Sequence, residues 1–127
     1  MYDIVVKKIE WDIISKYQKD AEAEGILFSD NSTYYAFYLN GRMFGFGAIL
    51  YKGKDATSKS DWIFPPFRKK GLYGKAFELK KQLAFDNGIK YLHGHCTTMS
   101  IGTHKRLGAE IIKVYKNGIT KIRYENI

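Results

Sequence analysis

Residues 61–75 read Asp61-Trp-Ile-Phe-Pro-Pro-Phe-Arg-Lys-Lys-Gly-Leu-Tyr-Gly-Lys75, and this stretch decides the fold. It predicts an apolar strand, a double proline, a basic turn that contains glycine, and the start of an amphipathic helix. Pro65 and Pro66 end the strand, because proline has no N–H to donate to a sheet ladder. The first N–H groups of the helix have no carbonyl partner, and the helix dipole makes that end positive. The turn therefore predicts a site for an anion such as a phosphate.

Glycine and positive charge gather at this turn. Gly71 and Gly74 let the chain turn tightly and let a ligand approach the main chain. Basic side chains add positive charge around the same point: Arg68, Lys69, Lys70 and Lys75. The glycine spacing fits neither a nucleotide P-loop nor the dinucleotide-binding fingerprint. A basic surface turn without a ligand is the alternative that the stretch alone leaves open.

The rest of the chain predicts a single α+β domain over residues 1–127. Apolar runs predict about seven strands, at residues 2–8, 33–39, 43–50, a run that ends at Phe64, 90–96, 109–115 and 119–124. Apolar residues at helical spacing predict helices at 11–24, 72–86 and 98–107. This order of elements predicts a mixed sheet flanked by about three to four helices.

Two local signals refine the first half of the sheet. Asn40-Gly41 is a strong signal for a β-hairpin turn. Gly45 and Gly47 fall on one face of the second strand of that hairpin, so that face has no side chains and leaves room for something to lie close. The alternative is a bulge or a tightly packed helix above the strand. Residues 52–60 are polar and basic and are interpreted as a connection that leads into the next strand.

The composition limits the partners and the compartment. The formal net charge is +8 and the sequence pI is about 9.5, which favours polyanionic ligands and leaves both coenzyme A and nucleic acid open. Cys96 is the single cysteine, so no internal disulfide can form and a reducing compartment is expected. No long apolar run or signal-like N-terminus is present. We therefore expect a soluble, cytoplasmic protein with no membrane partner.

Two stretches resemble the signatures of one family. Residues 63–74 resemble the acyl-CoA-binding motif of the GCN5-related N-acetyltransferase (GNAT) superfamily, in which an aromatic residue and an arginine precede a glycine. Residues 97–109 resemble the second signature of the family and match it at Ser100, Leu107 and Gly108. The two stretches are in the order of the family and are separated by one helix and one strand. The resemblance implies a mostly antiparallel GNAT-like sheet with α/β/α layering.

The resemblance also implies an activity and a donor site. The activity would be direct transfer of an acetyl group from acetyl-CoA to an amine acceptor. The pantetheine arm would enter between two splayed strands, the one that ends at Phe64 and the one that ends at Cys96. Residues implied to bind the coenzyme are Ile63, Phe64, Arg68, Lys69, Lys70, Gly71, Leu72, Tyr73, Gly74, Lys75, Thr97 and Ser100. Tyr73 departs from the family, which has glycine or alanine there, so only its amide is expected to contact phosphate, with the ring pointing away.

The catalytic residues follow from the same resemblance. His104 stands where the family has a tyrosine that acts as general acid, and an imidazole can donate a proton near neutral pH. The alternative is a surface histidine on a short helix. Asp61 is the candidate general base, with Asp55 as a second candidate, because members of the family often place a carboxylate on or before this strand. Asp61 could also be a strand-end residue in solvent.

The sequence leaves open other interpretations of the site and of the function. His93 and His95 share one strand face near Cys96, but no further ligand has suitable spacing, so no metal site is predicted and one histidine could instead serve as the base. The alternative functions are a nucleic-acid-directed GNAT relative that modifies a DNA or RNA base, as in some phage DNA-modification proteins, and a CoA-binding module without turnover. Exposed edge strands could pair two copies into a homodimer. The sequence does not identify the acceptor.

Overall fold

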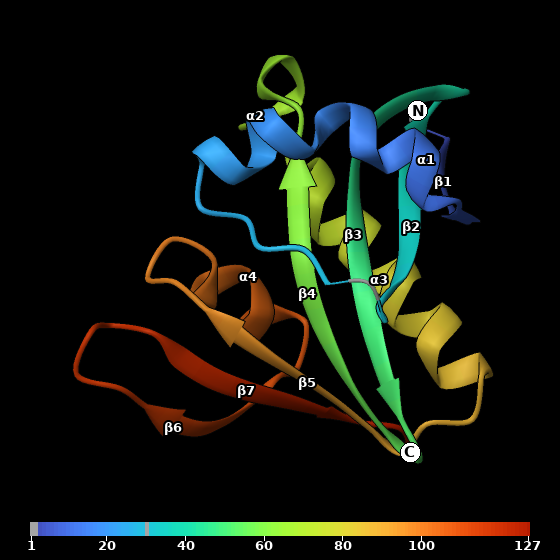
Figure 1. The fold of residues 1–127 in the computed structure, drawn as a ribbon. Helices are drawn as coiled ribbons and strands as arrows, with labels where there is room; N and C mark the ends of the chain where they lie inside the picture. The colour runs from blue at the N-terminus through green and yellow to red at the C-terminus, as the bar shows by residue number, and fades with distance from the viewer. Residues whose placement is uncertain (1–2, 30) are drawn as a thin grey trace.

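The computed structural model describes residues 3–29 and 31–127. Within these residues the chain forms one seven-stranded sheet in the order β1-β2-β3-β4-β5-β7-β6 (Figure 1). The strands are β1 (Ile4–Ile9), β2 (Thr33–Leu39), β3 (Arg42–Lys52), β4 (Asp55–Ile63), β5 (Tyr91–Cys96), β6 (Glu110–Val114) and β7 (Thr120–Glu125). Neighbouring strands are antiparallel except β4 and β5, which are parallel. The prediction of a mixed, mostly antiparallel sheet is confirmed.

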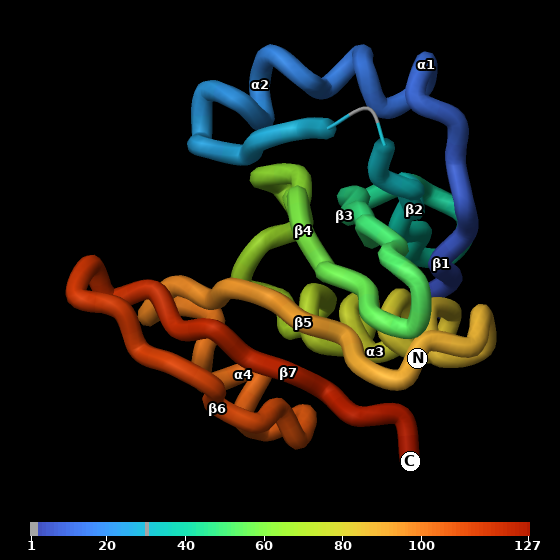
Figure 2. Tube along the Cα trace, turned by 60° about the horizontal axis from the view of Figure 1, so that its bottom comes forward, coloured from blue at the N-terminus to red at the C-terminus, as the bar shows by residue number. Residues whose placement is uncertain are grey.

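Helices cover both faces of the sheet, as Figures 1 and 2 show. They are α1 (Trp11–Ile14), α2 (Gln18–Ala23), α3 (Leu72–Asp86) and α4 (Ile101–Arg106), and two 3-10 turns are η1 (Ser15–Tyr17) and η2 (Pro65–Phe67). Ile14 and Ala21 of the first two helices pack with Phe46 and Trp62 on one face. Helix α3 packs on the opposite face, where Phe77 lies in the largest cluster of buried residues. The α/β/α layering is thereby confirmed, and none of the helices in the described residues is long and apolar enough to cross a membrane.

Most of the predicted elements are found close to their expected bounds. Helix α3 begins at Leu72 and ends at Asp86, as the apolar spacing predicts. Asn40 and Gly41 both have positive φ, 49° and 84°, which is the backbone of a tight β-hairpin turn. The first strand was expected from residue 2, which lies outside the described residues, and β1 begins at Ile4.

The helix predicted at residues 11–24 is interrupted, so that prediction is wrong in its continuity. Helix α1 ends at Ile14 and α2 begins at Gln18, with the 3-10 turn η1 between them. The Ser15 hydroxyl donates to the carbonyl oxygen of Asp12, at 2.9 Å. Such a bond lets the side chain compete for a main-chain acceptor of the helix, and it favours a tighter turn.

The polar connection predicted at residues 52–60 is also wrong, because most of it is strand. Strand β3 runs to Lys52 and β4 begins at Asp55, so only two residues form the turn. The polar side chains of β4 have partners elsewhere in the fold. Ser58 accepts a hydrogen bond from Lys80 and Lys59 contacts Ser29. Propensity alone misses such a strand, because its stability depends on these tertiary contacts.

Strands β4 and β5 pair over a short distance and then diverge. The paired residues are Asp55–Thr57 on β4 and Tyr91–His93 on β5. Beyond them β4 stays with β3 as far as Ile63, and β5 stays with β7 as far as Cys96. Figure 1 shows the two strands separating towards their C-terminal ends. This divergence is the feature of the fold that positions the candidate site.

Candidate active site

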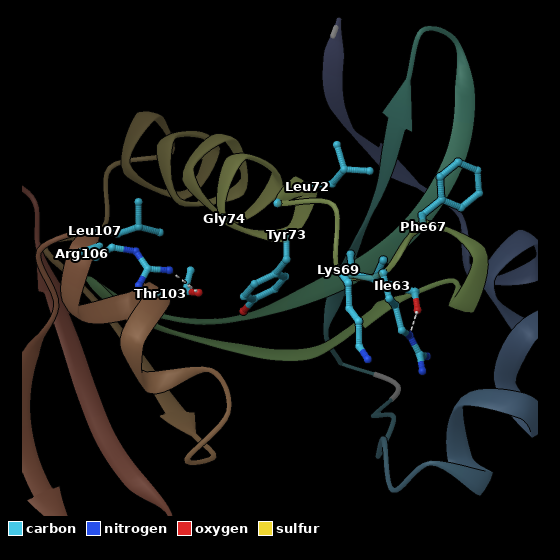
Figure 3. Close-up of a pocket in the computed structure, with 11 residues that line it drawn as sticks. Ile63, Phe67, Lys69, Leu72, Tyr73, Gly74, Thr103, Arg106 and Leu107 are labelled. Carbon is cyan, nitrogen blue, oxygen red and sulfur yellow. Dashed lines mark hydrogen bonds between the residues drawn. The ribbon is translucent and has the colours of Figure 1, made fainter.

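A first cavity of about 380 Å³ lies at the start of α3. It is lined by the end of β4, the basic turn and one face of α4. Its lining residues are Ile63, Phe67, Arg68, Lys69, Gly71, Leu72, Tyr73, Gly74, Thr103, Arg106 and Leu107. Most of the residues that the family resemblance implies for coenzyme binding therefore line this one cavity. Figure 3 shows the Lys69 and Arg106 side chains on opposite sides of Tyr73.

The turn owes its shape to its own backbone and to Arg68. Lys69 and Gly71 have positive φ, 61° and 74°, and a Cβ on Gly71 would have no atom within 4 Å apart from those of Gly71 and its two chain neighbours. Arg68 Nε donates to the carbonyl oxygen of Ile63 at 2.8 Å, and the guanidinium pairs with Glu24 of the segment after α2 at 2.8 Å. Arg68 thus holds the turn against the end of β4, and the Glu24 carboxylate partly neutralises the charge of Arg68.

Other predicted coenzyme residues lie away from this cavity. Lys70 and Lys75 are exposed and do not line it. The Phe64 amide donates to Phe44, and its carbonyl accepts from Phe67, both at 2.9 Å. The Phe64 amide is therefore already paired within the protein.

A second cavity of about 310 Å³ lies between the diverging ends of β4 and β5. Its lining includes Asp61 from β4, the end of β5, two residues between β5 and α4, and His104 from α4. Both predicted catalytic residues, Asp61 and His104, line it, and so do Thr97 and Ser100. Tyr73 lines this cavity as well as the first one. The two cavities therefore share Tyr73 as a lining residue.

Asp61 and His104 are joined by a partly buried chain of hydrogen bonds through Tyr73. The Tyr73 hydroxyl donates to Asp61 Oδ2 at 3.0 Å and lies 3.2 Å from His104 Nε2. On the far side, His104 Nδ1 lies 2.8 Å from the Tyr124 hydroxyl. Asp61 Oδ1 forms an ion pair with Lys80, whose side chain is fully buried. We call these five residues, Lys80, Asp61, Tyr73, His104 and Tyr124, the polar network.

Chemistry fixes the direction of the hydrogen bonds in the polar network. A carboxylate only accepts, so the single hydroxyl proton of Tyr73 points to Asp61. The Tyr73 oxygen can then only accept from His104, which requires a proton on Nε2. The Tyr124 hydroxyl has two acceptors, His104 Nδ1 at 2.8 Å and the His104 carbonyl oxygen at 3.3 Å, and Nδ1 of a neutral imidazole protonated on Nε2 accepts from this hydroxyl as the nearer of the two. The network therefore holds His104 as one tautomer, protonated on Nε2.

Burial sets the protonation states of these groups. His104 is only 4% exposed, and burial lowers its pKa below the ordinary value of histidine. Burial raises the pKa of Tyr73 well above its ordinary value, and the nearby charge of Asp61 raises this pKa further. Burial lowers the pKa of Lys80, an effect that Asp61 opposes. At neutral pH we therefore take His104 as a neutral imidazole and Tyr73 as a phenol.

These positions remove two of the open alternatives. His104 is buried rather than a surface residue, because α4 packs its ring against Phe77, with the ring centroids 4.5 Å apart. The Asp61 side chain is 15% exposed rather than a solvated strand end. The sequence did not single out Lys80 or Tyr124. Lys80 belongs to the helix predicted at residues 72–86, in which a lysine is ordinarily exposed, so a buried lysine had no local signal.

Gly47 of β3 makes room for the polar network, whereas Gly45 lies against Trp62 and Ile63 of β4. A Cβ on Gly47 would fall on Asp61 Oδ1 and would lie 3.0 Å from Lys80 Nζ. The pairing of β3 with β4 shifts register between Phe46 and Ala48. The register shift is the bulge that was one of the alternatives, and the space beside Gly45 and Gly47 is filled by atoms of β4 and by Lys80 of α3. The bulge also places Ser60 at a φ of 57°, and its hydroxyl donates to the carbonyl oxygen of Leu27.

The remaining candidates lie at the rim of the second cavity. His93 and His95 both line it, and His93 Nε2 is 3.0 Å from Asp55. Cys96 is buried, and burial raises its pKa to about 11, so it is a thiol at neutral pH. In the part of the chain that the structure describes, no three side chains of His, Cys, Asp or Glu are grouped so that they could hold a metal ion.

Comparison with known proteins relates this chain to others through its fold. No protein-family model matches the sequence, and no curated protein matches it, whereas 340 chains of solved structures do. An IAA acetyltransferase from Bacillus cereus aligns with a TM-score of 0.77 and 14% identity, over 97% of this chain and 99% of that chain. The Bacillus subtilis acetyltransferase in complex with CoA aligns with a TM-score of 0.73 and 10% identity, over 98% and 100% of the two chains.

A third match carries the family name. An acetyltransferase of the GNAT family from Streptococcus pneumoniae aligns with a TM-score of 0.72 and 12% identity, over 97% of this chain and 99% of that chain. Each alignment covers nearly the whole of both chains, so the likeness includes the order and layering of the sheet. The chain has the fold of the GNAT acetyltransferases.

Proposed function

We propose that this protein is an acyl-CoA-dependent N-acyltransferase that moves an acetyl group from acetyl-CoA directly to an amine. The observation that carries the proposal is a pair of cavities that share Tyr73 as a lining residue. One is basic and lies at the N-terminus of α3, and the other is polar and lies between β4 and β5. A diphosphate suits the first, and a thioester arm suits the second. The fold of acetyltransferases supports the same reading.

The diphosphate of the donor would be bound by main chain and charge. The N-terminus of α3 has no side-chain cap, so its amides are available to an anion. Gly71 leaves open space for the ligand, and Lys69 and Arg106 supply positive charge at the rim of the cavity. Ile63, which lines the first cavity at the end of β4, would contact the pantetheine. Thr97 and Ser100 would meet its far end in the second cavity.

The chemistry would need a base for the amine and an acid for the thiolate. Asp61 is the proposed base, and the acid function is proposed for the site that His104 forms with Tyr73. Asp61 and His104 both line the second cavity, and the Tyr73 hydroxyl connects them. The acceptor would enter the second cavity beside His93 and His95. A small-molecule amine and a protein amine are the proposed acceptor classes.

The test measures binding first and turnover second. Calorimetry with CoA and with acetyl-CoA should give saturable heat, and a thiol reagent should detect CoA release when an amine acceptor is present. Mass spectrometry of the acceptor should find one added acetyl group. Binding without thiol release across amines, proteins, DNA and RNA would favour a module without turnover. No heat with either ligand would reject the proposal altogether.

A further inference from the structure

Two histidines of β5 belong both to the second cavity and to the face of the sheet that lies opposite α3. Leu92 and Cys96 of this strand pack in the same cluster as Phe77 of α3. Because side chains alternate along a strand, His93 and His95 lie on the other face, and both line the cavity. Helices α1 and α2 lie over β2 to β4 on that face (Figure 1). An acceptor that approaches from this face would therefore meet side chains of β4, β5 and β7.

Two lysines on this face have no carboxylate partner. Lys59 of β4 lines the second cavity and is half-buried. It is paired with Ala48, which packs against α1 and α2, so it lies on the same face, and its ammonium donates to the Ser29 hydroxyl at 3.4 Å. On the other side of β5, Lys121 of β7 is paired with His95. Neither lysine forms an ion pair with a carboxylate of the residues that the structure describes.

The carboxylates near the cavity, in contrast, already have basic partners. Asp61 is the one carboxylate in the described lining, and it pairs with the buried Lys80. The carboxylates on the same face of the sheet are bonded to basic side chains within 3.2 Å; they belong to Asp55, Glu110 and Glu125. Around the described lining, an acceptor therefore finds ammonium groups that can bind an anion, and no unpaired carboxylate that could bind a second ammonium.

We infer that the acceptor is a small amine that also carries a carboxylate, and that Lys59 binds this carboxylate while Lys121 adds positive charge beyond His95. This inference rests on the proposed function and names its acceptor class. A half-buried ammonium with only a hydroxyl as its partner gains a charge-assisted hydrogen bond from a carboxylate. A polyamine would bring a second ammonium against the lysines, and a protein lysine would bring no carboxylate. The cavity of about 310 Å³ suits a molecule of amino-acid size.

The decisive experiment compares acceptors that differ only in the group at the far end from the amine. One set is γ-aminobutyrate, butylamine and putrescine, which share their chain length and end in a carboxylate, a methyl group and an ammonium. A second set pairs phenylalanine with phenethylamine and alanine with ethylamine, which lack the carboxylate. We expect kcat/KM, measured by thiol release from acetyl-CoA, to be about 10-fold or more higher for the acceptors with a carboxylate. Putrescine should be the poorest acceptor.

Charge variants of one lysine test whether it is the group that binds the carboxylate. Lys59→Met should raise KM for the acceptors with a carboxylate by about 10-fold and leave kcat/KM for butylamine nearly unchanged. Lys59→Glu should reverse the preference in favour of putrescine. Lys54→Met, in the exposed turn between β3 and β4, is the matched control and should keep the wild-type preference. Melting temperatures verify that each variant is folded, and Lys121→Met, with a smaller loss of the same sign, replaces Lys59→Met if that variant does not fold.

The outcomes separate this inference from the function on which it rests. If the wild type acetylates both members of each pair equally, or prefers polyamines or protein amines, the inference is wrong and the proposed function stands. A preference for carboxylates that survives in Lys59→Met, or in Lys121→Met where that variant replaces it, would also overturn the inference. A wild type that binds CoA but releases no thiol with any amine removes the proposed function, and the inference with it.

Discussion

The basic turn at the start of α3 and the polar network behind it lie side by side but are built in different ways. The turn is one continuous, mostly exposed stretch whose shape comes from prolines, from Gly71 and from the start of a helix. The polar network has Lys80, His104 and Tyr124 buried and Asp61 and Tyr73 partly buried, and it takes its side chains from α3, β4, α4 and β7. The turn offers main-chain amides and tolerates changes in side chain. Each member of the network depends on a particular partner, so single substitutions there should have larger effects.

The largest effect is expected for Lys80→Met. Methionine fills the space of lysine but leaves the Asp61 carboxylate without its charged partner in a buried place. Removal of one partner of a buried ion pair costs about 3–5 kcal/mol, measured as the free energy of unfolding in denaturant. Lys75→Met, on the exposed side of the same helix, is the matched control and should change stability by less than about 0.5 kcal/mol. The double variant Lys80→Met/Asp61→Asn should regain much of the loss, and a cost below about 1 kcal/mol for Lys80→Met alone would contradict a closed network.

Gly47→Ala tests the fit of the network against the sheet. The added Cβ would overlap Asp61 Oδ1 and approach Lys80 Nζ to 3.0 Å. Overpacking of this kind costs about 1–3 kcal/mol, which thermal or denaturant unfolding will detect. Gly94→Ala in β5 is the control, because its Cβ would meet Ile122 at an ordinary 3.5 Å. Equal stabilities of the two variants would mean that the space around Asp61 is not tightly filled.

Gly71→Asp tests the turn, where charge should matter more than packing. The position has φ of 74° and open space around it. Asp and Asn both tolerate this backbone, so Gly71→Asn controls for strain and the difference between the variants reports the charge. A carboxylate beside the helix N-terminus should weaken CoA binding by about 10-fold relative to Asn, as measured by calorimetry. Identical Kd values would place the diphosphate elsewhere.

The smallest effect is a pH dependence of stability that comes from His104. Burial lowers its pKa in the folded state, so below about pH 6.5 the unfolded chain takes up a proton that the folded chain resists. Its contribution to stability is complete above that pH and is lost as the pH falls, by at most about 1.4 kcal/mol per pH unit. His104→Gln should flatten this part of the slope in denaturant unfolding between pH 7 and 5. A variant with the wild-type slope would show that the ring takes up a proton without leaving the network.

The sequence predicted the turn well and the network only in part. The double proline and glycines of residues 65–74 act on their own neighbours, so the start of α3 at Leu72 could be read directly. Asp61 and His104 were singled out through a family resemblance, without any sign that Tyr73 would join them. Lys80 had no local signal, because a lysine in a helix is ordinarily exposed. Residues 55–60 were not predicted as a strand, because the partners of their polar side chains are distant in sequence.

The sequence by itself determined the order of the elements, the hairpin at Asn40-Gly41 and the basic turn that opens α3. These depend on backbone preferences and on hydrophobic periodicity, which act over a few residues. Only the tertiary structure decided that Tyr73 would turn its hydroxyl towards Asp61 and His104, and that Lys80 would be buried beside them. Burying charge and hydroxyl groups is favourable only when their partners are present. Those partners come from separate elements, which only the completed sheet and its helices bring together.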